Sequence, residues 1–380
     1  MSMIKALWSS DHHTLHPHTP TRHTLSCMDK FYYKDNNPKE IKLSVFGGDV
    51  FHDLASANDP NMILVQRWFK KYNHICHENK TYARYLEGTS SHDWGQPELL
   101  EISKPKGSPY VKYINTLCIE YFPDLDINVL YVPDNFGKVN TETIYELALE
   151  ELAKHNLTQV DFIFLHGGFK FQLPPIADKH GTLYDELKWS KLAKHAIFSG
   201  HIHKPARKLN IHCSGSFNRT AYGEMHPKGA YRFSFNKEKF FAEFWDNKDA
   251  QIYDYIDVTP ETTTKELIKI LNKYLEKKPP VRTHIKVRNG EGSVVVPLLN
   301  EYKEQFPDYV FESDNVKKEN VNIDETLYDP EEYAGVQLTK ENLKDNLYRF
   351  IKNQLGDSVN LFEQYDKELL DELLDEAMND

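Results

Sequence analysis

The sequence predicts an α/β fold whose functional residues follow the strands. Short apolar runs recur over residues 4–235, and each is followed by histidine or aspartate, usually with glycine. Amphipathic stretches at helical spacing lie between these runs. After about Asp254 the pattern changes, which predicts a second, smaller domain. Because open α/β sheets place their chemistry at the carboxyl ends of strands, the polar residues after the runs are the candidate functional residues.

The apolar runs are predicted to be buried strands. In chain order they are IKALWS, IKLSVFGGDVFHD, INVLYVPD, VDFIFLHGG and AIFSGHIHKP, and NIHCSGSF and GAYRFSF continue as strands. The segment TLHPHTPTRHT has no period and predicts a loop. MILVQRWFKKYNHI and TETIYELALEELAKH are predicted helices, the second with Asn140 or Thr141 as its N-cap.

The composition changes divide the chain into four parts. We expect a main domain over residues 1–253, a small domain over 254–311, an acidic, aperiodic linker over 312–335 and amphipathic helices over 336–380. In the small domain, TTTKELIKILNKYLEKKPP is a predicted helix that opens with the capping box Thr263-x-x-Glu266. The following stretch, VRTHIKVRNGEGSVVVPL, predicts two strands joined at a tight Asn-Gly turn.

Charge and cysteine content restrict the class of protein. The net charge of −11 argues against a nucleic-acid binder when taken alone, although bound cations or a basic partner can reverse a local field. One predicted strand face is basic and is a candidate DNA-binding surface through Arg282, Lys286 and Arg288. The four cysteines are scattered without CxxC spacing, and no apolar run could span a bilayer. These features predict a cytoplasmic protein with no membrane association.

The residues after the strands are of the metal-ligating type. They are Asp11, His13, Asp49, His166, His201 and His203. Imidazole and carboxylate together suit Mn²⁺, Fe²⁺ or Zn²⁺ better than Mg²⁺ or Ca²⁺. One aspartate between two histidine-rich half-sites can bridge two ions, and such a pair clamps the attacking and leaving oxygens of a phosphate ester. A lone DxH is weakly specific and a lone GHxH moderately so, and the prediction rests on the order of all the motifs along the chain.

The loop LEGTSSHDWGQ adds an adjacent His92-Asp93 pair. Together with DxH, GGD, strand-His-Gly and GHxH, it gives an order of motifs that resembles that of the calcineurin-like metallophosphoesterases. Within them the chain is similar to the SbcD family, the nuclease subunit of the SbcCD DNA-repair complex. Two further segments carry the resemblance, GGDVFH with His52 and CSGSFNRTAYGE. The resemblance implies a four-layer β-sandwich flanked by helices, with a small α/β capping domain and C-terminal helices.

The resemblance also implies roles for the ligating residues. One metal would be held by Asp11, His13, Asp49 and His203, and the other by Asp49, His166, His201 and Ser91. Ser91 stands where the family has Asn in a shorter loop, so Thr89, Ser90 or a water remain alternatives.

The loop histidines and Asp93 would act on the substrate. His92 would donate a proton to the leaving oxygen or stabilise developing charge, and Asp93 would orient it. His52 would position DNA or the phosphate, or else make a supporting hydrogen bond.

The activity that the resemblance implies is a two-metal DNA nuclease dependent on Mn²⁺. It would act as a 3′→5′ exonuclease on duplex ends and as an endonuclease. It would form a homodimer and bind an SbcC-type coiled-coil ATPase through the C-terminal helices. A phage-encoded member would work in the host cytoplasm. A stand-alone phosphoesterase for nucleotides or phosphoproteins is one alternative, and a non-catalytic subunit with a degraded site is another.

Overall fold

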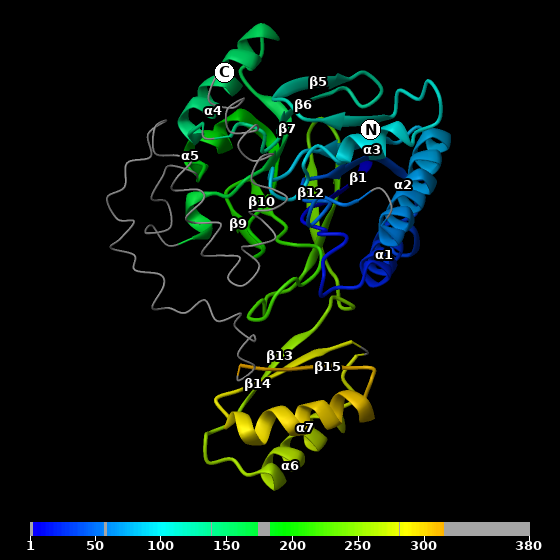
Figure 1. Cartoon of the computed structure of the whole chain (residues 1–380). Coiled ribbons are helices and arrows are strands. Elements are labelled where there is room, and N and C mark those ends of the chain that lie inside the picture. Colours follow the sequence, from blue (N-terminus) through cyan, green and yellow to red (C-terminus); the bar gives the residue numbers. More distant parts are fainter. Residues whose placement is uncertain (1–2, 57–58, 138, 174–182, 281, 315–380) are drawn as a thin grey trace, which may run out of the picture.

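The larger part of the chain folds into two mixed sheets flanked by helices. The structure is a computed structural model that describes residues 3–56, 59–137, 139–173, 183–280 and 282–314. In these ranges two six-stranded sheets form the larger unit, and a three-stranded sheet with two helices forms a smaller one (Figure 1). The α/β prediction is therefore confirmed.

The first sheet has the order β12-β11-β1-β2-β3-β4. Its strands are β1 (Ile4–Ser9), β2 (Ile41–Phe46), β3 (Tyr82–Leu86), β4 (Val111–Ile114), β11 (Gly229–Phe235) and β12 (Phe240–Asp246). The first four strands in the chain run parallel, so their carboxyl ends meet at one edge. β11 returns antiparallel to β1 and places β1 in the interior of the sheet.

The second sheet has the order β5-β6-β7-β8-β10-β9. Its strands are β5 (Cys118–Phe122), β6 (Ile127–Val132), β7 (Val160–His166), β8 (Ala193–Gly200), β9 (Ala206–Lys208) and β10 (Ile211–Cys213). β6, β7, β8 and β10 are parallel, so their carboxyl ends also share an edge.

The two sheets pack face to face on an aromatic core, and helices cover their outer faces. Trp8, Phe164, Phe198 and Phe233 lie in the core between the sheets. Helices α1 (Thr21–Asp29), α2 (Pro60–Asn79) and α3 (Pro97–Ile102) lie over the first sheet, and α4 (Thr141–Lys154) and α5 (Glu186–Trp189) over the second (Figure 1). This gives four layers. α1 begins inside the segment predicted as a loop, and the side chain of Asn140 caps α4 as predicted.

The small unit alternates strands with helices. Its parallel strands are β13 (Tyr253–Asp257), β14 (His284–Arg288) and β15 (Val310–Ser313), and its helices are α6 (Thr264–Leu275) and α7 (Gly292–Gln305). The capping box at Thr263 and Glu266 is confirmed. The prediction of a second strand after the Asn-Gly turn is wrong, because that segment forms the helix α7. Its buried residues Val295, Leu298, Leu299 and Tyr302 follow helical spacing, although valines favour strands.

The described residues end shortly after β15, which extends past the predicted boundary at residue 311. Most of the predicted linker and the predicted C-terminal helices over 336–380 lie outside the described residues. Among the described helices, none combines the length and apolar character that a bilayer crossing needs.

Candidate metal centre

The carboxyl ends of β1, β2, β7 and β8 bring the predicted histidines and aspartates together. One group consists of Asp11, His13 and His203, and the other of Asp49, His166 and His201. In each group the ligand atoms lie within 4.8 Å of one another. Two compact His/Asp groups therefore lie side by side where the two sheets meet. His201 and His203 belong to one loop, and the backbone of His13 is hydrogen-bonded to that of Asp49.

The loops after β1 and β2 are locked together by their backbones. Asp11 N–H donates to the carbonyl of Gly48 at 3.0 Å, and His13 N–H donates to the carbonyl of Asp49 at 3.0 Å. Asp11, His13 and Asp49 all have positive φ, at 52°, 44° and 49°. Non-glycine residues with this backbone are strained and concentrate at functional sites. The side chains of these three strained residues all belong to the two His/Asp groups.

Two glycines allow the loops to approach the groups closely. A Cβ on Gly88 would lie 2.1 Å from the backbone nitrogen of Asp49, and one on Gly48 would lie 2.3 Å from Nδ1 of His166. Gly48 also has φ of +92°. No side chain fits at either position, which explains the glycines that precede Asp49 and follow β3.

In the first group, His13 and His203 face each other through their Nε2 atoms at 3.0 Å. The Asp11 carboxylate accepts the backbone N–H of His201 at 3.0 Å, which fixes it between the strands. Burial lowers the pKa of His13 well below its ordinary value. The His13 imidazole is therefore neutral near neutral pH and has a lone pair available for a cation.

Glu224 holds the orientation of His203. His203 Nδ1–H donates to Glu224 Oε1 at 2.7 Å, which leaves Nε2 directed at His13. Burial alone would raise the pKa of Glu224, but His203 and Lys228 hold it at about 2. Glu224 belongs to the segment CSGSFNRTAYGE that carries part of the family resemblance, but no role was predicted for it from the sequence. A carboxylate behind a ligating imidazole is the usual support of a metal site.

Replacing Glu224 by glutamine is expected to weaken metal binding at the first group. The amide keeps the shape but accepts a weaker hydrogen bond from His203, and loss of such a support typically costs about 10- to 100-fold in affinity. Calorimetric titration with Mn²⁺ measures the change. Glu243→Gln is the matched control, since Glu243 is exposed on β12 and pairs with Arg232. Equal affinities in the two variants would contradict the role of Glu224.

In the second group, His166 and Asp49 are in direct contact. His166 Nδ1–H donates to the carbonyl of Gly47 at 2.7 Å, and its Nε2 lies 3.3 Å from Asp49 Oδ2. Burial would raise the pKa of Asp49, but His166 and then His13 hold it well below its usual range. Asp49 thus interacts with a histidine of each group, as a bridging carboxylate would. Burial favours neutral His166, yet Asp49 raises its pKa well above the ordinary value, so cation binding has to displace a proton there.

Thr89, and not Ser91, is the hydroxyl residue that the structure brings to the second group. Thr89 Oγ1 lies 3.3 Å from Asp49 Oδ2, from His166 Nε2 and from His201 Nδ1. Its backbone N–H also donates to Asp49 Oδ1 at 2.6 Å. Ser91 is exposed on the outer side of the turn. The hydroxyl that was predicted from Ser91 is thus supplied by Thr89, one of the alternatives that the loop left open, while Ser90 and Ser91 are exposed.

Replacing Thr89 by valine is expected to lower affinity at the second group by about tenfold, the low end of what supporting residues contribute in metal sites. Valine keeps the branched shape and removes only the hydroxyl. Mn²⁺ titration by calorimetry should show one weakened site and one unchanged. Ser91→Ala is the matched control and should bind like the parent protein. A loss of affinity in Ser91→Ala with none in Thr89→Val would reverse the assignment.

His92 and His52 lie at the rim of the first group. The His92 and His13 rings are 4.8 Å apart between centroids, and His52 Nδ1 lies 3.3 Å from His13 Nδ1. The Nδ1 of His92 is bonded to the carbonyl of His52. A carbonyl can only accept, so the proton is on Nδ1 and Nε2 is left to face a substrate. The ligating atoms of His13, His52 and His92 also lie within 4.8 Å of one another.

Asp93 contacts backbone and not the His92 ring. Its Oδ2 accepts the N–H groups of Asp49 and Gly88 at 2.9 and 2.8 Å, and its Oδ1 accepts that of Phe51 at 3.0 Å. The predicted role of orienting His92 is therefore not supported, because the His52 carbonyl performs it. The buried Asp93 carboxylate instead fastens the loop after β3 to the loop after β2.

The predicted basic face is largely neutralised by acidic neighbours. Arg288 pairs with Asp257 through two hydrogen bonds of 2.7 Å, and Lys286 lies 2.8 Å from Asp314. Arg282 precedes β14 and has φ of 68°. These pairings weaken the prediction that Arg282, Lys286 and Arg288 bind DNA, since a phosphate would have to displace carboxylates.

The small unit nevertheless contacts the loop that carries His13. The Tyr253 hydroxyl is 3.0 Å from Thr19 Oγ1, and His284 Nε2 is 3.0 Å from the carbonyl of His18. The amino-terminal ends of β13 and β14 are thus connected to the metal centre through a few residues.

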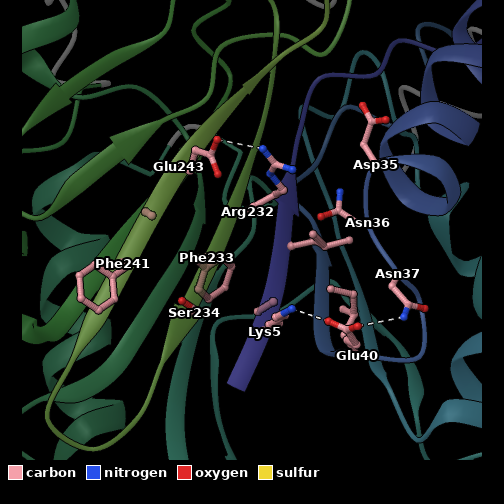
Figure 2. Close-up of a pocket in the computed structure, with 14 residues that line it drawn as sticks. Lys5, Asp35, Asn36, Asn37, Glu40, Arg232, Phe233, Ser234, Phe241 and Glu243 are labelled. Carbon is pink, nitrogen blue, oxygen red and sulfur yellow. Dashed lines mark hydrogen bonds and ion pairs between the residues drawn. The ribbon is translucent and has the colours of Figure 1, made fainter. Parts of the chain in front are cut away.

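A cavity of about 470 Å³ lies elsewhere, at the amino-terminal end of β1 (Figure 2). Its charged side chains pair among themselves, Lys5 with Glu40 and Arg232 with Glu243. None of its lining residues belongs to the His/Asp groups. Lys5 lines the cavity near the start of β1, whereas Asp11 of the metal centre lies two residues past the end of β1. The cavity is separate from the candidate metal centre.

The two groups fit divalent cations in their donor chemistry. Each offers two imidazoles and a carboxylate, a mixture that suits Mn²⁺, Fe²⁺ or Zn²⁺. In each group one imidazole has its outer nitrogen held by an acceptor, Glu224 for His203 and the Gly47 carbonyl for His166. Such acceptors select the tautomer that presents a lone pair to the metal.

Comparisons with known proteins give distant structural matches. No family model matches the chain, and no curated protein does. One solved crystal structure is 10% identical and aligns over 64% of this chain and 100% of its own length with a TM-score of 0.39. Another, TT1561 of Thermus thermophilus, is 10% identical over 64% of this chain and 99% of its own, with a TM-score of 0.36. At these scores neither bears on function.

Proposed function

We propose that the protein is a two-metal phosphoesterase. The observation that carries the proposal is the pair of adjacent His/Asp groups with Asp49 in electrostatic contact with both. Paired cations held by adjacent ligand groups are typical of enzymes that cleave phosphate esters. The histidines at the rim add a proton donor beside them.

Some of these residues would bind the cations, and His92 would transfer a proton. One cation would be held by Asp11, His13 and His203, the other by His166, His201 and Thr89, with Asp49 between them. Bound there, the cations would supply Lewis-acid activation of water and of the phosphoryl oxygens. His92, whose Nδ1–H is held by the His52 carbonyl, would act as a general acid in its imidazolium form, in which Nε2 carries a second proton that passes to the leaving oxygen.

Metal dependence tests the proposal directly. The protein, treated with EDTA and then dialysed, is assayed on bis(p-nitrophenyl) phosphate and p-nitrophenyl phosphate with added Mn²⁺, Mg²⁺ or Zn²⁺. We expect no hydrolysis with EDTA and recovery with Mn²⁺, the ion that the donor set favours over Mg²⁺. Binding of two Mn²⁺ ions with no hydrolysis of any ester would refute the enzymatic function.

A DNA nuclease of the SbcD type is a narrower form of the same proposal. Docking of the small unit on residues 18 and 19 beside the metal centre favours it, because a cap there would contact a long substrate. The ion-paired Lys286 and Arg288 and the net charge of −11 count against tight duplex binding by this chain alone. End-labelled duplex DNA, assayed beside the small esters with and without a coiled-coil ATPase partner, separates the two. The homodimer and the partner remain proposals.

A further inference from the structure

Trp94 is the tryptophan that the fold leaves in solvent. The chain has five tryptophans. Trp94 is 59% exposed, whereas Trp8, Trp68, Trp189 and Trp245 are 0%, 7%, 1% and 6% exposed. Burying an indole is among the larger gains available to a fold, and tryptophan is enriched where proteins bind other molecules.

The exposure of Trp94 is imposed by a rigid turn. Trp94 has φ of 50° and Gly95 has φ of 73°, and a bulky residue rarely adopts this backbone. Both sides of the turn are fastened. Asp93 accepts three backbone N–H groups, and Gly95 N–H donates to Glu87 Oε1 at 2.7 Å. The Gln96 side chain then bonds the 53–55 loop, accepting from Ala55 N–H at 2.8 Å.

The turn that carries Trp94 also carries groups of the reactive centre. Thr89 contacts the second His/Asp group, and His92 lies against His13. Trp94 follows His92 by two residues, which span at most about 7 Å. The neighbouring loop has the same pattern, since exposed Leu54 follows His52 by two residues. Two exposed apolar residues, Trp94 and Leu54, therefore lie on the loops that carry His92 and His52.

We infer that Trp94 is a specificity-determining residue that stacks on a nucleobase of the substrate next to the scissile phosphate. Bases stack on aromatic side chains with little dependence on sequence, and a tryptophan offers the largest face. The inference rests on the proposed phosphoesterase function and narrows its substrate class to phosphodiesters of nucleosides.

The test compares substrates that differ only in a base. Thymidylyl-thymidine and its analogue with an abasic residue in place of one thymidine share the same diester and the same alkoxide leaving group. In Trp94→Ala we expect KM for thymidylyl-thymidine to rise by roughly 5- to 150-fold, the range of one base stacked on an aromatic ring, while KM for the abasic analogue and both kcat values change little. Trp94→Phe should restore most of the loss. Phe241→Ala is the matched control, because Phe241 is 62% exposed and lines the cavity at the far end of β1.

Binding without turnover gives an independent readout. In EDTA, thymidylyl-thymidine should quench the exposed-tryptophan emission of the parent protein, and the abasic analogue should quench it less. Trp94→Phe should show no quenching. Quenching of this kind with no hydrolysis in Mn²⁺ would support the stacking role and refute the enzymatic function. If Trp94→Ala hydrolysed both substrates with no base-dependent change in KM, the stacking role alone would be overturned. The same holds if the only effect of Trp94→Ala were a change of oligomeric state in sedimentation.

Discussion

Asp49→Asn is expected to abolish hydrolysis and to weaken cation binding at both His/Asp groups at once. The carboxylate is buried, contacts His166 directly, and is the first charge that raises the pKa of His13 in the other group. An amide at this position removes the negative charge that two cations would share. Loss of several kcal/mol of transition-state stabilisation corresponds to a decrease in kcat of about 10³-fold or more.

The measurement combines Mn²⁺ calorimetry with hydrolysis of bis(p-nitrophenyl) phosphate. The control is Asp249→Asn, in which an exposed carboxylate paired with Lys30 is neutralised. It should keep full activity and both binding events. If Asp49→Asn lost one binding event and retained the other unchanged, Asp49 would belong to a single site and the bridging role would be wrong.

His92→Gln is expected to slow hydrolysis in a manner that depends on the leaving group. A general acid contributes about 10²- to 10⁴-fold, but only when the leaving oxygen needs a proton. The loss should therefore reach that range with thymidylyl-thymidine, whose leaving group is an alkoxide. With a p-nitrophenyl diester it should stay under about tenfold, because p-nitrophenolate leaves without a proton.

The leaving-group comparison for His92 is read against a second histidine variant. His74→Gln is the control, since His74 is an exposed imidazole on α2. Equal losses for both leaving groups would make His92 a phosphate-binding residue and exclude it as the proton donor.

The grouping of the metal-type residues could be predicted from the sequence because it needs no long-range information. Each lies directly after an apolar run, and parallel strands bring such ends together. Ser91 was misplaced because the path of a turn depends on which residue faces inward. Thr89 faces inward, and Ser90 and Ser91 are exposed. The roles of Asp93 and Glu224 depended on contacts across loops that no local pattern records.

Strand β3 and the neutralisation of the basic face were missed because the charged residues there have partners that are distant in sequence. β3 carries Arg84, which is 1% exposed and is held by Glu120 on β5 through hydrogen bonds of 2.8 and 2.7 Å. A buried arginine interrupts the apolar signal of a strand, and its partner is distant in sequence. The strand face with Lys286 and Arg288 looked basic in the sequence because the aspartates that neutralise these two residues lie on other segments.

The interior position of β1 has a consequence for synthesis of the chain. β1 is made well before β11, the strand that closes its other side, because β11 begins only at Gly229. At roughly 5–20 residues per second, about 10 to 45 seconds separate the two during translation. Throughout that interval one hydrogen-bonding edge of β1 is unpaired, which invites pairing with other chains. The nascent protein is therefore most exposed to aggregation before β11 is released, and slower translation upstream of Gly229 should lower its soluble yield.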